Sequence, residues 1–440
     1  MLPRRPFRIS RRRFMAAALA AAPAALSAGC LPPGNRDEPT PPPPSDPTPS
    51  PPTVPAPSEW AAFTAKLAVF RDRRRHFIFE YYPWYHSDPW RHWDEAGRKP
   101  PIDIGSFAVP ALGPYDSRDA KVLEQHARWI ADAGVGAVNI SWWGQGSVED
   151  RAVPLVMDVM RAHDIRVTFH MEPYTTSRGT RLAEDLLYLI REYGERRRWD
   201  TFLLLEDANG IARPVFKLFL THLPPTGTDC KGRVFPVADY TEDGVYRRQI
   251  DTVRTALRAD FDPIVLSDSL DAARNAAGGF NGTAIYNSYI RPGTWPSLAT
   301  DFSSSELFFS FPINPGFDRY PDRPPFPECY SPSQFEPPID ATGWDTAARA
   351  EALNASRNRI VDSLRTNLTL QLDPALTNVK RGFFLAYINS FNEWHEGTAF
   401  EPAADLADLT PAQRAIGYHN PDEGQWRLEL LGDLMRQLTP

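Results

Sequence analysis

Short apolar runs alternate with longer amphipathic segments along most of this chain, from Trp60 onward. Eight of the apolar runs have the length of a buried strand and stop at polar or turn-forming residues. Such continuous apolar runs are typical of parallel strands that are covered on both faces. The alternation therefore predicts an α/β fold, and the strand count favours a closed (β/α)8 TIM-type barrel over an open sheet. The eight runs are Phe77–Tyr81, Ala137–Trp142, Val167–His170, Val215–Leu220, Ile264–Ser267, Ala284–Tyr286, Leu307–Phe311 and Phe383–Ile388.

The segments between these runs show helical spacing of apolar residues. In Asp119–Asp132 the spacing follows a helix cap expected at Ser117. The fourth strand has a second candidate, because Asp200–Leu205 competes with Val215–Leu220. Residues 59–440 are expected to form one domain, since a barrel with extensions uses a chain of this length. The other predicted helices are Val153–His163, Arg181–Tyr193, Tyr246–Ala259 and Asp345–Leu370.

Residues 1–30 have the composition of an export signal. Six arginines precede the apolar run from Phe14 to Leu26, and Ser10-Arg11-Arg12-Arg13-Phe14 resembles a twin-arginine motif. Leu26-Ser27-Ala28-Gly29-Cys30 resembles a lipobox, in which the cysteine is lipidated after cleavage. We expect export to the periplasm or cell surface with a lipid anchor at Cys30, and plain secretion by the general route is the alternative. The apolar run is shorter than the roughly 20 residues that a spanning helix needs, so the lipid is the expected membrane contact.

Residues 31–58 form a proline-rich linker. Half of the residues from Pro32 to Pro57 are proline. This composition favours extended polyproline conformations. The linker is interpreted either as a semi-rigid stalk that holds the folded domain off a membrane or as a tether with no role beyond reach.

Export would place the two remaining cysteines, Cys230 and Cys329, in an oxidising compartment. Neither belongs to a Cys-x-x-Cys pair. A single long-range disulfide and two unrelated thiols are both compatible with the sequence.

The mature chain is acidic. The full chain carries a net charge of −7, and the export signal contains six arginines and no acid, so its removal lowers the charge to about −13. A general nucleic-acid binder needs a basic face, and no nucleic-acid partner is expected.

Polar and aromatic side chains follow five of the predicted strands. In a barrel they would gather at the C-terminal face of the ring, where barrel enzymes carry their active sites. Sugars stack their C–H faces on aromatic rings and pair their hydroxyls with carboxylates and amides, so the mixture predicts a carbohydrate site. The candidate substrate-binding residues are Tyr82, Trp84, Tyr85, Trp142, Trp143, His170, Glu172, Tyr174, Tyr286, Tyr289, Asn392, Trp394 and His395.

Each of these residues, taken singly, also has a structural interpretation. Aromatic residues such as Tyr81, Trp93 and Trp142 commonly pack at strand ends. Glu172 has many arginines to pair with, and a buried, hydrogen-bonded imidazole is the favoured interpretation of His170. The functional interpretation depends on finding the same residue types, aromatic rings with carboxylates or amides, at five strand ends.

Glu393 and Glu396 stand three residues apart after the last predicted strand. Glycoside hydrolysis needs one carboxyl group to protonate the leaving oxygen and another to act as nucleophile or base. Typical retaining enzymes mount the two groups on different strands, whereas neighbours in one turn approach the sugar from one side. The spacing favours a route in which one carboxylate deprotonates a substrate hydroxyl, which then performs the displacement.

No metal ion or cofactor is expected. Glu393-Trp394-His395-Glu396 lacks the His-Glu-x-x-His spacing of a zinc protease. The chain contains no Gly-x-Ser-x-Gly elbow, no Gly-x-Gly-x-x-Gly after a strand and no phosphate-binding loop.

Several segments within residues 75–435 match a known family pattern, and the last of them is the most specific. They are Tyr81-Tyr82-Pro83-Trp84-Tyr85, Asp103-Ile104-Gly105 with Gly113-Pro114-Tyr115-Asp116-Ser117-Arg118-Asp119, Val167-Thr168-Phe169-His170-Met171-Glu172-Pro173-Tyr174, Gly279-Phe280-Asn281-Gly282 and Asn389-Ser390-Phe391-Asn392-Glu393-Trp394-His395-Glu396-Gly397-Thr398. With these segments the chain resembles glycoside hydrolase family 99, the endo-α-1,2-mannosidases and mannanases, which are retaining (β/α)8 barrels.

The resemblance implies a role for each matching residue. Glu396 would be the general acid/base on the departing oxygen, and Glu393 the base that draws the proton from the 2-hydroxyl of the reacting mannose, giving a 1,2-anhydro sugar. Glu172 would hold the 2-hydroxyl region. Tyr82, Tyr85 and one of Tyr286 or Tyr289 would line the same subsite.

The expected function is therefore retaining, endo-acting hydrolysis of α-mannosidic linkages in α-1,2-mannoside-type oligosaccharides or mannan, by a monomer. Two segments depart from the family pattern: Trp143 replaces a tyrosine in a shortened loop, and Tyr286-Asn287-Ser288-Tyr289 has one extra residue. The alternatives are the same chemistry on another α-linked glycan, or a non-catalytic carbohydrate-binding lipoprotein. The intact pair of Glu393 and Glu396 argues against a binder.

Overall fold

The computed structural model describes residues 57–196, 198–258, 261–319, 335–339 and 344–440. The predicted export signal, the lipobox cysteine Cys30 and the linker up to residue 56 lie outside the described residues, as does Cys329.

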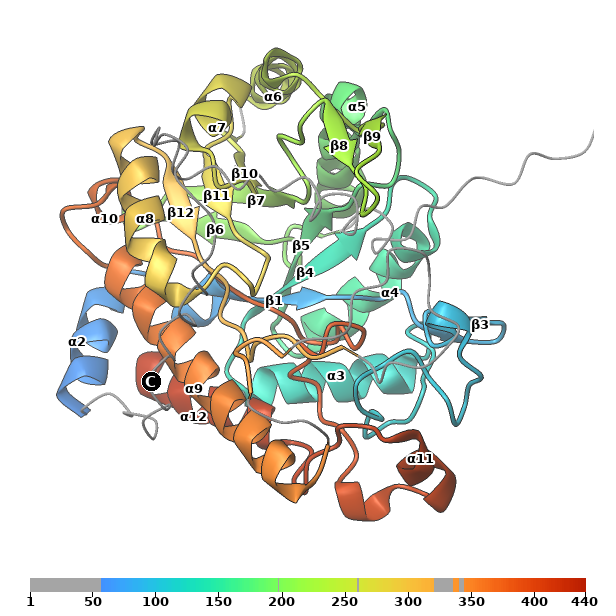
Figure 1. Ribbon diagram of the computed structural model, residues 1–440. Coiled ribbons are helices and arrows are strands. Elements are labelled where there is room, and N and C mark those ends of the chain that lie inside the picture. Colours follow the sequence, from blue (N-terminus) through green and yellow to red (C-terminus); the bar gives the residue numbers. More distant parts are fainter. Residues whose placement is uncertain (1–56, 197, 259–260, 320–334, 340–343) are drawn as a thin grey trace, which may run out of the picture.

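Eight parallel strands form the centre of the fold, surrounded by helices (Figure 1). Seven parallel ladders connect neighbouring strands from β12 round to β13. The ring closes through one bridge, between Ile313, just after β12, and Ile388 on β13. Here the Ile313 N–H donates to the Tyr387 carbonyl (2.9 Å) and the Asn389 N–H donates to the Ile313 carbonyl (2.8 Å). In ring order the strands are β1 (Phe77–Tyr81), β4 (Ala137–Trp142), β5 (Arg166–Met171), β7 (Ala212–Leu218), β10 (Ile264–Ser267), β11 (Gly282–Ala284), β12 (Phe308–Ser310) and β13 (Ala386–Ile388).

All eight predicted strands are confirmed, with two refinements. The fourth is Val215–Leu220, seen as β7, whereas its competitor contributes β6 (Leu204–Glu206), which pairs antiparallel with β7. The sixth strand lies two residues earlier than predicted and starts at Gly282, where a Cβ atom would stand 2.1 Å from the Phe308 carbonyl oxygen. Only glycine permits this approach of two backbones.

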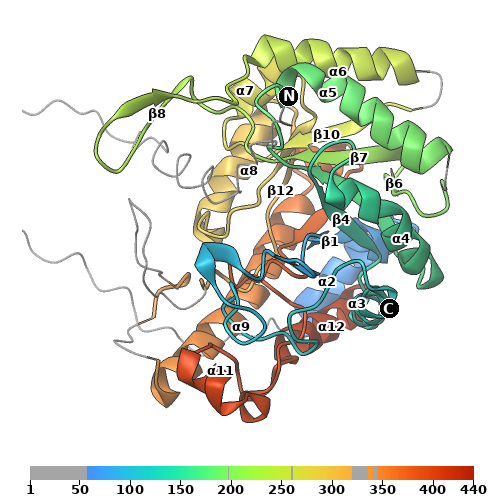
Figure 2. The ribbon, with the colours of Figure 1, turned by 90° about the vertical axis from the view of Figure 1, so that its right-hand side faces the viewer.

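Helices cover the outside of the ring in both views (Figures 1 and 2). The first and last described helices lie together, and the Thr64 hydroxyl donates to the Gln437 carbonyl across 2.7 Å. None of the helices in the described part of the chain is both long and apolar enough to cross a membrane. The α-helices are α2 (Pro57–Leu67), α3 (Ala120–Asp132), α4 (Val148–Ala162), α5 (Arg178–Leu189), α6 (Asp243–Leu257), α7 (Ala272–Gly278), α8 (Trp295–Ser304), α9 (Thr346–Gln371), α10 (Thr377–Lys380), α11 (Pro411–Ile416) and α12 (Trp426–Leu438).

Several helix starts differ from the prediction. Helices α5 and α6 each begin three residues earlier than predicted, and the differences at α3 and α4 have identifiable causes. The cap of α3 is Asp119, whose carboxylate accepts from the Lys121 N–H, and the expected cap Ser117 instead accepts from the Tyr85 N–H across 3.3 Å. Helix α4 begins five residues before the predicted start, and Pro154 lies inside the helix instead of in its first turn. A proline cannot donate to the carbonyl four residues earlier. The Tyr193 hydroxyl donates to that Asp150 carbonyl instead, across 2.9 Å.

Short strand pairs extend the loops around the ring. Strands β2 (His86–Ser87) and β3 (Trp90–Arg91) form one antiparallel pair, and β8 (Thr226–Thr228) and β9 (Val234–Pro236) form another, which projects from the body in Figure 2. Cys230, between β8 and β9, is disulfide-bonded. This excludes the alternative that Cys230 and Cys329 are both free thiols.

Candidate active site

The segment from Asn389 to Thr398 turns back on itself directly after β13 and is buried throughout. The Ser390 N–H donates to the Thr398 carbonyl (2.9 Å), and the Ser390 hydroxyl accepts from the Glu393 N–H (2.8 Å). Gly397 has a φ of 66°, and a Cβ atom there would stand 2.0 Å from the Asp318 carbonyl oxygen. The tight return, which depends on this glycine, holds both carboxylates at the C-terminal face of the ring.

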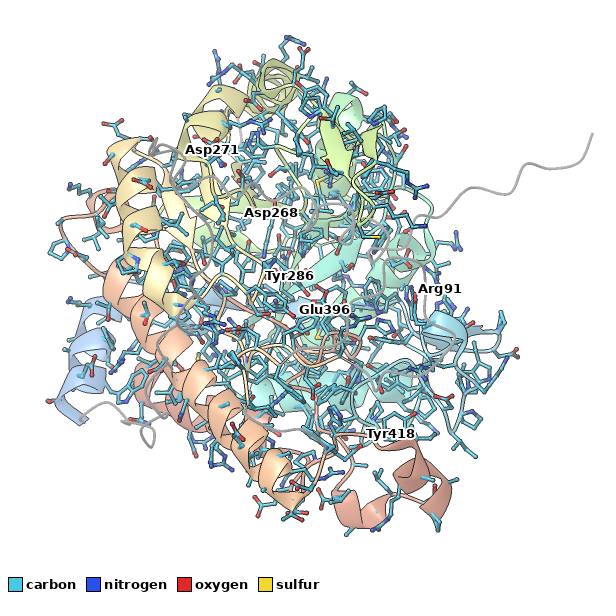
Figure 3. The ribbon with its side chains drawn as sticks, in the orientation of Figure 1. Arg91, Asp268, Asp271, Tyr286, Glu396 and Tyr418 are labelled. Atoms are coloured by element: carbon cyan, nitrogen blue, oxygen red, sulfur yellow. The ribbon has the colours of Figure 1, made fainter. Side chains whose placement is uncertain are left out.

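Glu396 is held by tyrosines from two other strand ends. Tyr286, after β11, donates to the Glu396 Oε2 atom across 3.2 Å, and Tyr82, after β1, donates to the Tyr286 hydroxyl across 3.0 Å. Figure 3 shows Tyr286 and Glu396 next to each other near the middle of the ring. The fold therefore brings Tyr82, Tyr286 and Glu396 together, as the sequence predicted.

Tyr289 also lies near this carboxylate, at the edge of the site. Burial, and after it the charge of Glu396, raises the pKa of Tyr289 to about 12. Its ring is 38% exposed and lies 5.1 Å from the ring of Phe317. Tyr286 thus contacts Glu396 directly, whereas Tyr289 presents an aromatic face to solvent beside it.

Glu393 contacts His395 within the same turn. The Nδ1 atom of His395 lies 3.1 Å from the Glu393 Oε1 atom, and its Nε2 atom donates to the His92 carbonyl across 2.8 Å. Burial, and after it the charge of Glu393, raises the pKa of Tyr85 well above its usual value, which keeps the Tyr85 hydroxyl protonated. This hydroxyl accepts from the Trp394 N–H across 3.1 Å.

The side chains of Asn392 and Trp394 form hydrogen bonds with other residues of the protein. The Asn392 side chain accepts from the Tyr82 N–H (2.8 Å) and donates to the Tyr82 carbonyl (3.1 Å). The Trp394 indole N–H donates to Glu401 across 2.8 Å. Both are placed where they fix the positions of Tyr82 and of the carboxylate turn.

A carboxylate that is not among the predicted site residues, Glu401, joins this turn to α3. Glu401 is fully buried and accepts from the Tyr115 hydroxyl (2.7 Å) and the Trp394 indole, while its other oxygen lies 3.1 Å from the His126 Nε2 atom. The Tyr81 hydroxyl lies 2.9 Å from the second nitrogen of His126. Only the position of Glu401, five residues after Glu396, hinted at a role.

Glu172 lies at the end of β5, fully buried. It accepts from the Ser141 hydroxyl across 2.8 Å, and the Trp143 indole N–H donates to the same hydroxyl across 3.1 Å. Trp143, half-buried, thereby places a ring on the same side as Glu172. Two predicted residues therefore converge through Ser141, which the sequence analysis did not single out as a binding residue.

A buried group of charges lies one layer below, inside the ring. Glu80 on β1 accepts from Lys217 on β7 (2.6 Å) and from Asn139 on β4 (2.9 Å), and His170 on β5 lies 2.9 Å away. Burial alone would raise the pKa of Glu80, but the charges of His170 and Lys217 outweigh it and lower this pKa to about 2. His170 therefore belongs to this charge group. Its Nδ1 atom is buried and hydrogen-bonded, as the structural interpretation predicts, whereas its Nε2 atom has no partner among the described residues.

Two buried side-chain nitrogen atoms near the site have no hydrogen-bond partner among the described residues. They are the Trp84 indole N–H and the His170 Nε2 atom. Trp84 stacks on the His92 ring at 4.4 Å and lies 6.3 Å from the Trp143 ring. An unpaired buried donor is costly, and such donors suit a hydroxyl-rich ligand.

Trp142 and Tyr174 lie on the helix-covered side of the ring. The Trp142 indole donates to Asp150 on α4 across 2.7 Å, and Tyr174 donates to Asp185 on α5. Their rings lie 5.4 Å apart. The structure thus places these two predicted residues with the helices, apart from Glu393 and Glu396.

A cavity that is open to solvent lies beside the carboxylate turn, bordered by Asp318, Glu401 and Arg427. Neither Glu393 nor Glu396 lines it. Within the described residues, no group of three or more histidine, cysteine or acidic side chains is arranged to hold a metal ion. The strand ends present carboxyl groups, tyrosine hydroxyls and aromatic faces.

Comparison with known proteins gives concordant matches. The profile of glycosyl hydrolase family 99 matches residues 72–202, which span β1 to β5. The glycoprotein endo-alpha-1,2-mannosidase-like protein of Danio rerio is 26% identical over 383 residues, which are 78% of this chain and 74% of that protein. The glycoprotein endo-alpha-1,2-mannosidase of Mus musculus is 24% identical over 362 residues, which are 73% of this chain and 67% of that protein.

A solved structure of the same family supports the architecture. The GH99 endo-alpha-mannosidase from Bacteroides thetaiotaomicron aligns with a TM-score of 0.57 at 18% identity, covering 84% of this chain and 98% of that one. At this identity the likeness concerns the fold, a (β/α)8 barrel. The profile, the relatives and the fold all agree on glycoside hydrolase family 99, and this chain is a glycoside hydrolase.

Proposed function

We propose that this enzyme cleaves internal α-mannosidic linkages of α-1,2-mannoside-type glycans or mannan with retention of configuration. The names of the relatives support the linkage and the sugar. The observation that carries the mechanism is the placement of Glu393 and Glu396 in one turn with different partners, a histidine for the first and a tyrosine for the second. Two carboxyl groups on one side of the sugar suit participation by a substrate hydroxyl.

In the first step Glu396 gives its proton to the glycosidic oxygen as the bond from that oxygen to C1 breaks. Glu393 takes the proton of the 2-hydroxyl, and the freed O2 forms a bond to C1, giving a 1,2-anhydro sugar. In the second step Glu396 removes a proton from water, which attacks C1, and O2 takes back the proton from Glu393. Two inversions at C1 give net retention, and both carboxyl groups return to their starting states.

The surrounding residues hold the sugar for these steps. Tyr286 fixes the Glu396 carboxyl group, and the buried Glu172 carboxylate receives a hydroxyl of the reacting sugar. The Trp84 indole N–H and the His170 Nε2 atom, which have no partner among the described residues, are matched to further hydroxyls. Tyr289 presents its exposed ring near Glu396.

A second function within the same chemistry is cleavage of another α-linked glycan. Trp143 favours it, because its ring stands beside Glu172 in a loop that is shorter than the family pattern. A non-catalytic binder is the remaining alternative. It does not explain why Tyr286 holds the carboxyl group of Glu396 in position.

The direct test is incubation of the purified protein with α-1,2-linked manno-oligosaccharides and with mannan. We expect short oligosaccharides from the wild type and none from Glu393→Gln or Glu396→Gln, with Glu184→Gln, on the exposed side of α5, as the active control. Tight binding without turnover on every α-glycan would identify a binder instead. A substrate that lacks the 2-hydroxyl should be inert, and normal turnover of it would exclude the anhydro sugar.

We also propose that the enzyme is exported and acts as a monomer, held at a membrane by a lipid on Cys30. The arginine-rich start and the small residues before Cys30 support this placement. Cys30→Ser should move the protein from the membrane fraction to the soluble fraction, and an unchanged distribution would contradict lipidation. Sedimentation of the detergent-solubilised protein should give the mass of one chain.

A further inference from the structure

His395 stands between two hydrogen-bond acceptors. Its Nε2 atom lies 2.8 Å from the carbonyl oxygen of His92, and its Nδ1 atom lies 3.1 Å from the Oε1 atom of Glu393. Both side chains are buried, with 5% of His395 and 2% of Glu393 exposed. The contact is therefore shielded from bulk water.

The proton arrangement follows from the chemistry of the two acceptors. A backbone carbonyl only accepts, so the Nε2 atom must carry a hydrogen. In a neutral imidazole the Nδ1 atom then carries a lone pair, which would face a carboxylate oxygen at hydrogen-bond distance. That contact is repulsive unless one proton lies between the Nδ1 and Oε1 atoms.

The proposed mechanism indicates whether this proton belongs to His395 or to Glu393. Glu393 can take the proton of the 2-hydroxyl only if it is ionised in the resting enzyme. We propose that His395 is an imidazolium in the resting enzyme, a positioning residue that donates from Nδ1 to the Oε1 atom of Glu393. This inference rests on the proposed role of Glu393.

The surroundings of His395 are compatible with a positive charge there. The titratable side chains that face it include Glu393, Tyr85 with its ring 5.6 Å away, and His92 with its ring 5.7 Å away. Burial lowers the pKa of His92, against the opposing influence of Glu95, so His92 stays neutral near pH 7. Glu393 is thus the one charged neighbour among the three, and it is of opposite sign.

A fixed donor on Oε1 also accounts for the return of the proton. Once Glu393 holds the proton of the 2-hydroxyl, the adjacent imidazolium makes the carboxyl group a stronger acid. The proton therefore goes back readily to O2 when water opens the anhydro sugar. His395 neither gains nor loses a proton over the cycle, so the balance of the two steps is unchanged.

The first experiment observes the ring directly, without turnover. In protein labelled with ¹⁵N-histidine, the His395 signals, identified by their loss in His395→Asn, should show two protonated nitrogens at pH 7. In Glu393→Gln the amide can donate to Nδ1, so the ring should become neutral with its hydrogen on Nε2. A neutral His395 in the wild type would overturn the proposal, whether or not the enzyme acts on α-mannosides.

The second experiment uses activity. A glycosyl fluoride needs little help from the acid Glu396, so loss of kcat/KM at high pH reports the Glu393–His395 pair. In His395→Asn a permanent amide donor replaces the ring, and the alkaline limb should rise by roughly one pH unit or more. An alkaline limb at the wild-type position in this variant would contradict the proposal.

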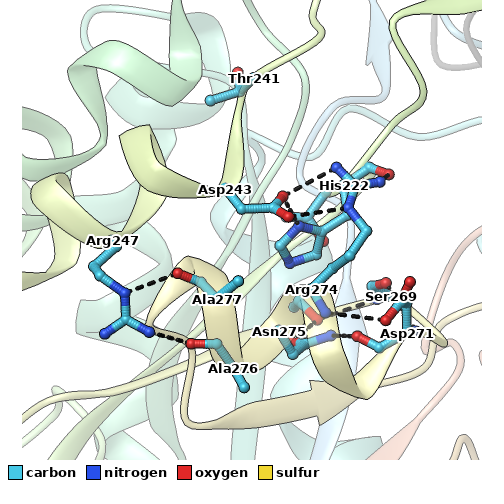
Figure 4. Close-up of polar contacts among 12 residues, drawn as sticks. His222, Thr241, Asp243, Arg247, Ser269, Asp271, Arg274, Asn275, Ala276 and Ala277 are labelled. Carbon is cyan, nitrogen blue, oxygen red and sulfur yellow. Dashed lines mark hydrogen bonds and ion pairs between the residues drawn. The ribbon is translucent and has the colours of Figure 1, made fainter.

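The chain offers a matched control for this variant. His222 is also buried and also contacts a carboxylate, with its Nδ1 atom 2.9 Å from Asp243, and Arg274 donates to the same carboxylate (Figure 4). This cluster lies between the loop after β7 and helices α6 and α7, and Glu393 is not part of it. His222→Asn should leave the alkaline limb where it is in the wild type.

Discussion

Tyr286 donates a hydrogen bond to Glu396 across 3.2 Å, although 110 residues separate the two along the chain. Tyr286 follows β11 and Glu396 follows β13, so the ring of strands brings them together. The same tyrosine accepts from Tyr82 after β1. The position of the proposed acid is therefore fixed by three strand ends at once.

Removing this hydroxyl should slow the reaction. Tyr286→Phe leaves the ring in place but deprives Glu396 of its donor, and a hydrogen bond to a charged group contributes roughly 1.5–3 kcal/mol. We expect kcat/KM to fall roughly 10- to 100-fold, with kcat carrying most of the loss. Tyr240→Phe, at an exposed tyrosine outside the site, should retain full activity. A wild-type rate in Tyr286→Phe would show that the hydroxyl does not orient the acid.

Glu401 should matter for both stability and turnover. Glu401→Ala leaves the buried donors of Tyr115, Trp394 and His126 without their acceptor, which should lower the free energy of unfolding by about 3 kcal/mol. Trp394 lies between Glu393 and Glu396, so kcat should fall as well. Glu401→Gln retains an acceptor and should be less affected on both measures. Thermal unfolding and initial rates, compared across the two variants, would check this order.

Stability should decrease below neutral pH because of His76. This side chain is buried and donates to the Phe384 carbonyl across 2.8 Å, and burial lowers its pKa from 6.5 to about 4. The unfolded chain therefore binds a proton at a higher pH than the folded protein, so stability is lost as the pH falls from 6.5 toward 4. At pH 5 the loss from this one group is about 2 kcal/mol.

His76→Asn provides the comparison for this effect. The amide can still donate to the Phe384 carbonyl, but it does not titrate. Urea unfolding at pH 7 and pH 5 should show a smaller difference in the variant than in the wild type. Equal differences in both proteins would assign the acid sensitivity to other groups, such as His86, whose pKa burial also lowers to about 4.

The buried charges of Glu80 and Lys217 should be strongly coupled. Lys217→Met leaves Glu80 charged in the interior with His170 as its remaining cation, and should lower the free energy of unfolding by about 3 kcal/mol or more. Adding Glu80→Gln removes the stranded charge. We therefore expect the double variant to be less destabilised than the sum of the two single variants, as a double-mutant cycle in urea would measure. Additive losses would show that the ion pair contributes little.

The strands were predictable because each is buried on both faces and therefore forms an apolar run. The positions of Glu393 and Glu396 followed from the last of these runs. The shift of β11 was not predictable, because it depends on contact between Gly282 and the backbone of Phe308, which is a property of the assembled ring. The early start of α4 was not predictable, because a proline usually lies in the first turn of a helix. Pro154 lies further inside because the Tyr193 hydroxyl donates to the Asp150 carbonyl, a contact that the sequence does not reveal.

The supporting residues of the site were harder to predict than the carboxylates. Glu401, Tyr115 and His126 come from three separate segments, and each is unremarkable in its own neighbourhood. Conversely, Trp142 and Trp143 are adjacent in sequence but point to opposite sides of the strand, as the alternation of side chains along a strand requires. Their different placements follow from that alternation.

The bridge at Ile313 gives the ring one weak seam. Every other pair of neighbouring strands is joined by a ladder, whereas the backbone bridge between β12 and β13 lies beyond the end of β12. Amide hydrogens at Ile313 and Asn389 can therefore exchange with solvent through a local opening that leaves the other ladders intact. The seam borders the segment that carries both carboxyl groups, so the backbone of the catalytic turn is tied to β12 through the two hydrogen bonds of Ile313.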